Sequence, residues 1–250
     1  MRVTGERVST PAGGFKPTWE RHVAAYAAAA ELLPPGRVLD LGCGVGHSYR
    51  LLAPRETVGL DVSADVLAGQ DRETVVSDMR ALPFPDTSFA SVVSVQSLEH
   101  VPDPERVLAE VVRVLEPEGV GVLVTPNRLT FSPPGEIVDP YHYVEWDPAE
   151  LRELCSLFFG SVTLRGIFGS ERYLAVVADE RRRLDALLRR DPLRLRRFVP
   201  RRLRQRLYDA KLRREREHAT PEQRAIGRED FWLGDTSLET ALDLVAVCRA

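Results

Sequence analysis

A glycine-rich loop follows the first apolar run of the chain. Residues 38–41 are Val-Leu-Asp-Leu, and Gly42, Gly44 and Gly46 come after them. Glycine permits a tight turn from a strand into a helix and lets a ligand approach the backbone closely. In the dinucleotide-binding fingerprint the third glycine stands one position later, where this chain has His47. The loop therefore predicts a bound ligand, and its spacing argues against a dinucleotide pyrophosphate.

Two acidic residues stand where a bound nucleoside would need them. Asp61 lies twenty-one residues after Asp40, and a carboxylate there can accept hydrogen bonds from both hydroxyls of a ribose. Asp78 follows the third β-branched run and can accept from an exocyclic amine, while Met79 can pack on a purine face. A plain turn with Asp78 as a local cap is the alternative. The combined positions favour a ligand that contains adenosine.

Candidates for acid–base chemistry follow the fourth β-branched run. Glu99 and His100 come directly after it, and His142 and Tyr143 stand in the 126–146 loop. Histidine titrates near neutral pH and is the most frequent general base. We prefer His100 because it closes the loop after this run. The alternative is that Glu99 and His100 only brace that loop.

The 126–146 loop is longer than most connections in compact domains, and loops of this length are often functional. Its residues 140–146 are rich in aromatic side chains. We expect them to form a wall of a second, acceptor pocket, with packing on the sheet edge as the structural alternative. His22 and Tyr26, four residues apart on the first predicted helix, can cover the ligand held by the glycine loop, with core packing as the alternative for Tyr26.

Composition limits the class of protein. The chain has 250 residues, 44% of them hydrophobic, and a net charge of −3, which argues against a polyanion-binding protein as a whole. It contains no apolar run long enough to span a membrane and no apolar signal core near Met1. Cys43, Cys155 and Cys248 are widely spaced and form neither a zinc pattern nor a disulfide framework. We expect a cytoplasmic protein without a membrane span.

Short β-branched runs alternate with helical patterns, which predicts an α/β fold with a doubly wound, mostly parallel sheet. The predicted strands are 37–41, 57–61, 74–77, 89–95, 120–125, 162–168 and 241–248. Helices are predicted at 17–33, 47–53, 64–68 and 104–115, and a further one begins after Asp147. The residues Asp103-Pro104 and Asp147-Pro148 each resemble an N-cap followed by proline.

The ordered set of motifs resembles the class I S-adenosylmethionine-dependent methyltransferases, over about residues 17–168. The set comprises Asp-Leu-Gly-Cys-Gly-Val-Gly at 40–46, Asp61, Asp78, Leu-Pro-Phe-Pro-Asp at 82–86 and Leu-Glu-His-Val at 98–101. The subgroup it is most similar to is the small-molecule type that includes the ubiquinone-pathway O-methyltransferases. This resemblance implies a seven-stranded Rossmann-like sheet in the order 3-2-1-4-5-7-6, with only the seventh strand antiparallel.

The resemblance also implies S-adenosylmethionine as cofactor and gives roles to individual residues. The loop from Gly42 to Gly46 would hold the methionine moiety, Asp61 the ribose and Asp78 with Met79 the adenine. The full set implied to bind the cofactor is Asp40, Gly42, Cys43, Gly44, Gly46, Asp61, Val62, Asp78, Met79 and Gln96. The expected reaction is methyl transfer by in-line displacement to a small-molecule acceptor, at oxygen or nitrogen. The candidate catalytic residues are His100, Glu99, His142 and Tyr143.

Some relatives bind a divalent ion through an E-x-x-E-H element and a later histidine. The matching positions are Gln96, Glu99 and His100, with His142 as the distant partner. Gln96 replaces the first carboxylate, and a hard cation prefers anionic oxygen. We therefore expect no metal, and activity that survives EDTA.

The segment Arg181–Glu217 carries 15 arginines and one lysine against five acids, a net charge of +11. Its leucines have helical spacing, which predicts a helical cap inserted before the last strand. We divide the chain into an N-terminal extension with a helix (1–36), a methyltransferase core (37–170), the cap (171–238) and a final strand (239–250).

The interleaved acids favour solvated cap helices over nucleic-acid binding. We expect the cap to shape the acceptor site, with a preference for an anionic acceptor. Two other functions stay open: an RNA or protein methyltransferase that uses the basic cap, and a donor-binding protein without turnover. The oligomeric state cannot be inferred from the sequence.

Overall fold

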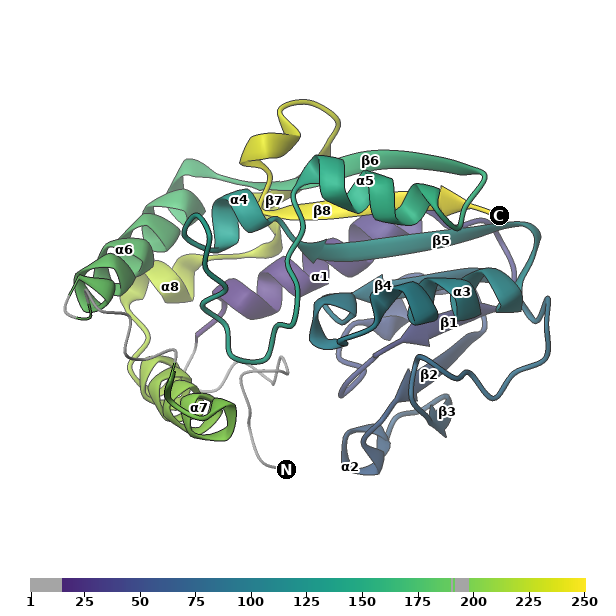
Figure 1. Cartoon of the computed structure of the whole chain (residues 1–250), viewed down its shortest axis with the longest axis horizontal. Helices are drawn as coiled ribbons and strands as arrows, with labels where there is room; N and C mark the ends of the chain where they lie inside the picture. The colour runs from purple at the N-terminus through teal and green to yellow at the C-terminus, as the bar shows by residue number, and fades with distance from the viewer. Residues whose placement is uncertain (1–14, 190, 192–197) are drawn as a thin grey trace.

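The computed structural model describes residues 15–189, 191 and 198–250, and these build one eight-stranded sheet with helices on both faces (Figure 1). Residues 190 and 192–197 of the arginine-rich segment lie outside the described part. The strand order is β3-β2-β1-β4-β5-β8-β6-β7. The strands are β1 (Val38–Leu41), β2 (Thr57–Asp61), β3 (Glu73–Val76), β4 (Phe89–Val95), β5 (Leu115–Pro126), β6 (Ser161–Gly169), β7 (Phe231–Gly234) and β8 (Asp243–Arg249).

The α-helices are α1 (Pro17–Leu32), α2 (Ala64–Leu67), α3 (Pro104–Val114), α4 (Arg128–Phe131), α5 (Pro148–Ser156), α6 (Glu171–Leu188), α7 (Arg201–Glu217) and α8 (Pro221–Ala225). Short 3-10 helices are η2 (Tyr49–Leu52), η3 (Leu98–His100), η5 (Arg228–Asp230) and η6 (Leu238–Thr240). Figure 1 shows α3 and α5 on one face of the sheet and α1 on the other. It also shows α6, α7 and α8 gathered beside the carboxyl ends of the strands, with the 126–146 loop between α7 and the sheet.

The relative order of the seven expected strands is confirmed, but their number was wrong. An eighth strand, β7, pairs antiparallel with β6 from Gly166↔Gly234 to Gly169↔Phe231. The expected last strand is β8, which runs antiparallel to both β5 and β6. β7 is only four residues long and lies at the sheet edge with Trp232 52% exposed. So short an edge strand has too little periodicity to be recognised in the sequence.

Alternate residues of the central strands pack into two hydrophobic cores. In β5, Leu123 packs with α3 and α5, whereas Val122 and Val124 pack with α1 and α6 on the opposite face. Every residue of β1 and β2 is buried, as expected for parallel strands covered on both faces. The two layers hold the carboxyl ends of β1, β2 and β4 in fixed positions beside each other.

The predicted caps of two helices have different outcomes. Asp147 forms a full capping box with Glu150, in which each side chain bonds the other's backbone amide. Asp103 is the N-cap residue of α3 and Pro104 begins the helix, as predicted, but the Asp103 side chain makes no capping hydrogen bond. Its carboxylate instead accepts a hydrogen bond from Arg80 at 3.0 Å.

The helix predicted at 47–53 is reduced to the single 3-10 turn η2. Pro54 follows it at once, and proline disfavours a helical conformation in the residue before it. The chain therefore passes from β1 into an open loop instead of a long helix. This loop forms one wall of the site described below.

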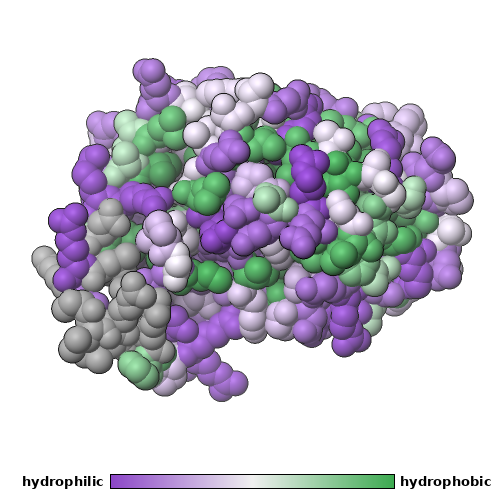
Figure 2. Space-filling model, turned by 45° about the horizontal axis from the view of Figure 1, so that its top comes forward, coloured by the Kyte–Doolittle hydropathy of each residue, from purple (hydrophilic) through white to green (hydrophobic). Residues whose placement is uncertain are grey.

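No helix in the described part of the chain is long and apolar enough to cross a membrane. On the face shown in Figure 2, hydrophobic residues form groups that are separated by hydrophilic ones.

Candidate active site

A cavity of about 330 Å³ opens at the carboxyl ends of β1, β2 and β4. Its position is the one at which open α/β sheets bind ligands. Ten of the fourteen residues named from the sequence as cofactor-binding or catalytic candidates line it, as do His22 and Tyr26; the ten are Gly42, Cys43, Gly44, Asp61, Val62, Asp78, Met79, Gln96, His100 and Tyr143. Asp40, Gly46, Glu99 and His142 are not among the lining residues. We call this space the central cavity.

The glycine loop has a backbone that side chains rarely permit. Gly42, Gly44 and Gly46 have φ values of +72°, +53° and +65°. A Cβ on Gly42 would lie 2.5 Å from Cβ of Ser97, so the close approach of the two loops also requires glycine there. A Cβ on Gly44 would meet no protein atom within 4 Å. Since Gly44 lines the central cavity, the space beside it is left for a ligand.

Asp61 fixes the glycine loop and faces the cavity at the same time. Its carboxylate accepts hydrogen bonds from the backbone amides of Gly44, at 3.1 Å, and Ser63, at 2.9 Å. The residue is 8% exposed. The position of Asp61 at the end of β2 predicted a ligand-binding carboxylate, and the structure adds that this carboxylate also holds the neighbouring glycine loop.

Asp40 has a supporting place behind the cavity. It is fully buried, accepts a hydrogen bond from the Tyr26 hydroxyl at 2.9 Å, and forms an ion pair with Arg72 at 2.8 Å. Burial raises its pKa, and the Arg72 guanidinium opposes that shift. Direct contact between Asp40 and the cofactor, as expected from the sequence, does not fit this position. Its hydrogen-bond partner Tyr26 does line the cavity.

Asp78 and Met79 follow β3 and line the central cavity. Arg80 binds the Asp78 carboxylate at 2.7 Å, and hydrogen bonds from Arg80 lower the pKa of Asp78. Asp78 therefore stays an acceptor at neutral pH. Val62 is 66% exposed and can cover one side of a planar ligand.

Gln96 is held by a residue far away in the sequence. It has a positive φ of +53°, and its side-chain amide donates to the carboxylate of Asp243 on β8. Arg21 on α1 donates to the same carboxylate. Asp243 was missed in the sequence because it lies 147 positions from Gln96 in an ordinary strand pattern.

A cluster of aromatic and imidazole rings covers one side of the cavity. His47 lies 4.5 Å from the ring of Trp19 and 5.9 Å from those of His22 and Tyr26, measured between centroids. Burial lowers the pKa of His22 to about 4 and that of His47 to about 3. Both histidines are neutral at pH 7, so the rings can lie beside a cationic ligand without repelling it.

These two histidines predict an acid-sensitive fold. As the pH falls below 6.5, both histidines become protonated in the unfolded chain. In the folded protein they stay neutral until about pH 4 for His22 and about pH 3 for His47. Their contribution to stability is therefore complete above pH 6.5 and is lost on acidification, at about 1.4 kcal/mol per pH unit for each histidine. Urea unfolding between pH 7 and pH 4 should show a smaller pH dependence in His47→Gln than in the parent. An unchanged slope in His47→Gln, or an equal decrease in the exposed-site variant His218→Gln, would contradict this assignment.

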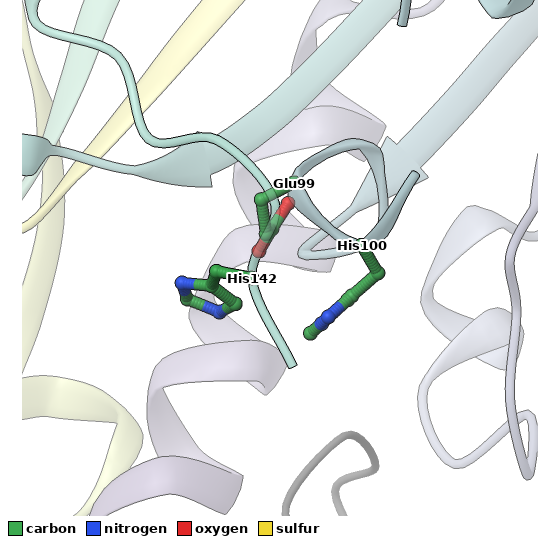
Figure 3. Close-up of side chains that lie close together, drawn as sticks. All are labelled: Glu99, His100 and His142. Carbon is green, nitrogen blue, oxygen red and sulfur yellow. The ribbon is translucent and has the colours of Figure 1, made fainter. Parts of the chain in front are cut away.

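Glu99, His100 and His142 lie close together (Figure 3). His100 lines the cavity, and its ring centroid is 5.0 Å from that of His142. The 126–146 loop is tied to η3 here, because the backbone amide of Tyr143 donates to the carbonyl of Glu99 at 2.8 Å. The structure thus brings together the four residues named from the sequence as catalytic candidates.

Glu145 was missed by the sequence analysis, which saw it only as part of an aromatic stretch. Its carboxylate bonds Nδ1 of His142 at 2.8 Å, and its side chain is fully buried. Burial lowers the pKa of His142, but the bond to Glu145 and the charges of Glu99 and Asp139 outweigh it, so the pKa of His142 is raised. Burial raises the pKa of Glu99 to about 7, against the charge of His142. In the sequence, only the three-residue spacing between His142 and Glu145 could have indicated this pair.

Helix α7 braces the 126–146 loop from outside. Arg201 donates to the carbonyls of Pro140 and Tyr141, and its guanidinium lies 3.7 Å from the ring centroid of Tyr143. Tyr141 donates to Asp209 at 2.9 Å. The described part of the arginine-rich segment therefore contacts the 126–146 loop, whose Tyr143 lines the cavity.

Comparison with known proteins agrees with this architecture. Residues 39–123 match the model of a methyltransferase domain family. A "Probable S-adenosylmethionine-dependent methyltransferase" of Mycolicibacterium smegmatis is 36% identical over 162 residues, which cover 62% of this chain and 63% of the relative. The 2-methyl-6-phytyl-1,4-hydroquinone methyltransferase of a Synechocystis species is 36% identical over 121 residues, 43% of this chain and 37% of the relative.

Among solved structures, a SAM-dependent methyltransferase from Thermotoga maritima superposes with a TM-score of 0.61 at 15% identity, over 92% of this chain and 90% of that one. This likeness concerns the fold alone. Sheet order and glycine loop together define a Rossmann-like methyltransferase fold. By its domain match and its relatives, the chain is similar to the class I S-adenosylmethionine-dependent methyltransferases. It spans less than two thirds of the length of the curated relatives described above.

Proposed function

We propose that this protein transfers the methyl group of S-adenosylmethionine to a small-molecule acceptor, at oxygen or nitrogen. One observation carries the proposal. The central cavity is lined by the glycine loop, Asp61 and Met79 and also by His100 and Tyr143. Groups that suit the donor and groups that suit the acceptor thus face the same cavity.

The donor would use the side of the cavity that the sequence assigned to it. Asp61 would accept from the ribose hydroxyls, Asp78 from the adenine amine, and the amides around Gly44 would face the methionine moiety. The sulfonium of S-adenosylmethionine is positive, and neutral His22 and His47 are compatible with it. Their lowered pKa values thus agree with a cationic donor.

The protein's main task in this reaction is alignment. The sulfonium already activates the methyl group, so a nucleophile placed in line with the carbon–sulfur bond is sufficient. An acceptor hydroxyl must also lose a proton, and His100 is the titratable side chain of η3 that reaches the cavity. Glu99 and His142 lie behind it and would hold His100 and the 126–146 loop in position.

The acceptor we favour is small and anionic or aromatic. The Synechocystis relative is named for a hydroquinone, which contains an aromatic ring. In this chain, Tyr143 offers an aromatic ring at the cavity, and the guanidinium of Arg201 lies over that ring. A ring and a cation at one rim would suit an aromatic compound with a carboxylate or phosphate group.

Two measurements separate this proposal from a donor-binding protein without turnover. Calorimetry should detect binding of S-adenosylhomocysteine, and incubation of S-adenosylmethionine with a small-metabolite extract should release S-adenosylhomocysteine. If S-adenosylhomocysteine binds but no extract leads to its release from S-adenosylmethionine, the non-catalytic alternative is supported. Binding of NAD in place of S-adenosylhomocysteine would refute the cofactor assignment.

A second candidate function is RNA methylation, favoured by the surface of α7. This helix exposes Arg202, Arg206, Lys211, Arg213 and Arg214. Such a surface can bind phosphates without contributing to the cavity. Filter binding of RNA at increasing salt tests it: affinity that falls steeply with salt and is lost when these cations are replaced would favour RNA as the acceptor.

The cap's part in acceptor binding leads to a point-mutation prediction. Replacing the whole segment Arg181–Glu217 would cut α6, whose Tyr173 packs in the core, so a single change is cleaner. Arg201→Ala removes two hydrogen bonds to the 126–146 loop and the contact with Tyr143. We expect kcat/KM for the acceptor to fall about tenfold or more because the acceptor KM rises. The affinity for S-adenosylhomocysteine should stay unchanged.

The matched control is Arg202→Ala, an exposed arginine on the next position of the same helix. It should leave both the acceptor KM and cofactor affinity as in the parent. Equal kinetics for the two variants would show that α7 has no role at the acceptor site.

A further inference from the structure

We propose that Glu99, His100 and His142 bind a divalent transition-metal ion, with zinc as the best-matched ion. One ligand atom from each residue lies within 4.8 Å of the other two. Figure 3 shows the three side chains around a common space, Glu99 and His100 from η3 and His142 from the 126–146 loop. This departs from the expectation of no metal, which rested on the missing carboxylate at Gln96.

Hydrogen bonds prepare both imidazoles to act as ligands. Nδ1 of His142 faces the Glu145 carboxylate at 2.8 Å, and Nδ1 of His100 faces the backbone carbonyl of Tyr141 at 3.3 Å. Carboxylate and carbonyl oxygens only accept, so Nδ1 carries the proton in each ring. Nε2 is then the nitrogen with the lone pair. A carboxylate or carbonyl bound to the second ring nitrogen is the usual support of a metal-binding histidine.

The carboxylate of Glu99 is fully buried and poorly satisfied. Its Oε1 has no hydrogen-bond partner, and Oε2 has only the Thr125 hydroxyl at 3.5 Å. An unpartnered carboxylate in a protein interior is costly and calls for a compensating cation or donor. A metal ion between Glu99 and the two histidines would provide it.

The charges around the cluster also favour a bound cation. Glu99, Asp139 and Glu145 are all buried near His142. Within the described residues, none of these three acids forms an ion pair with an arginine or lysine. Even when His142 is protonated and paired with Glu145, the three buried carboxylates exceed the positive charge beside them, and one divalent ion would offset this excess.

The donor set selects the kind of ion. Two imidazoles and one carboxylate suit zinc or ferrous iron better than magnesium or calcium, which prefer oxygen ligands. Ligands around tetrahedral zinc lie roughly 3.4 Å apart, given metal–ligand bonds of about 2.0–2.2 Å. The three side chains would therefore move together by about 1 Å.

Three protein ligands leave a coordination position open, and His100 borders the central cavity. If the proposed function holds, the ion would bind an acceptor oxygen there and lower the pKa of its hydroxyl. Gln96 is not needed, because its amide is bonded to Asp243. Metal binding itself does not depend on methyl transfer and can be measured without an acceptor.

The test uses the full chain after dialysis against EDTA. Calorimetry with Zn²⁺ should give one site per chain, and Co²⁺ should give the visible absorption of a four- or five-coordinate ion. Glu99→Gln, His100→Ala and His142→Ala should each weaken Zn²⁺ binding at least tenfold. Glu145→Gln should weaken it about ten- to a hundredfold, because Glu145 orients His142. His218→Ala, an exposed histidine elsewhere, should bind as the parent does.

Circular dichroism of each variant establishes that a loss of binding is not a loss of fold, and the nearly isosteric Glu99→Gln is the decisive one. Absence of saturable Zn²⁺ and Co²⁺ binding by the folded parent would overturn the proposal. So would loss of zinc in Cys43→Ser with the three cluster variants unaffected, since Cys43 also lines the cavity. If zinc binds but no methyl acceptor is found, only the proposed function fails.

Discussion

Replacing Gly44 by alanine should abolish most cofactor binding while the protein stays folded. The added Cβ would meet no protein atom within 4 Å, yet Gly44 lines the central cavity, so the methyl would occupy space left for the ligand. Its φ of +53° adds a backbone cost of roughly 1–2 kcal/mol. We expect affinity for S-adenosylhomocysteine to fall by tenfold or more in calorimetry, with a small decrease in melting temperature.

Gly69 offers a matched control for the backbone strain. Its φ is +82° and a Cβ there also meets no atom within 4 Å, but it does not line the cavity. Gly69→Ala should lose a similar amount of stability and keep its affinity for S-adenosylhomocysteine. If both variants bind equally well, the loop at Gly44 does not contact the cofactor.

Replacing Asp61 should have a similarly large effect through lost hydrogen bonds. Asp61→Ala would remove one or two charge-assisted bonds to the ribose, at about 1.5–3 kcal/mol each. It would also release the amides of Gly44 and Ser63, which loosens the glycine loop. We expect S-adenosylhomocysteine affinity to fall by roughly tenfold to several hundredfold.

Asp61→Asn separates the two effects, since an amide oxygen can still accept from one backbone amide. The affinity of Asp61→Asn for S-adenosylhomocysteine should lie between that of the parent and that of Asp61→Ala. Asp65→Ala is the control, because Asp65 is an exposed acid on α2, four residues away. Unchanged affinity in Asp61→Ala would remove this carboxylate from the cofactor site.

The two proposals concern opposite sides of one cavity and make separable predictions. Gly44 and Asp61 variants should affect the cofactor and leave Zn²⁺ binding intact. Variants of Glu99, His100 and His142 should affect Zn²⁺ and acceptor turnover and leave cofactor affinity nearly intact. Arg201 acts on the 126–146 loop from outside and should alter acceptor kinetics alone.

The sequence by itself determined the parts of the site that are local. Gly42 and Gly44 follow a buried strand directly, and Asp61 ends the next strand. Because parallel strands place their carboxyl ends at one edge of the sheet, the spacing along the chain was enough to bring these residues together. The capping box at Asp147 is likewise local, since all its atoms belong to residues 147–150.

Only the tertiary structure decided the pairings between distant residues. Gln96 meets Asp243, Asp40 meets Arg72, and α7 meets the 126–146 loop. Each of these residues also fits the pattern of the strand, loop or helix in which it stands. The sequence pattern therefore gives no indication of its distant partner. The same holds for β7, which is too short to show a period and is a strand only because β6 offers it an edge. The Glu99, His100 and His142 cluster exists for a similar reason: a backbone bond from Tyr143 to Glu99 ties the loop to η3.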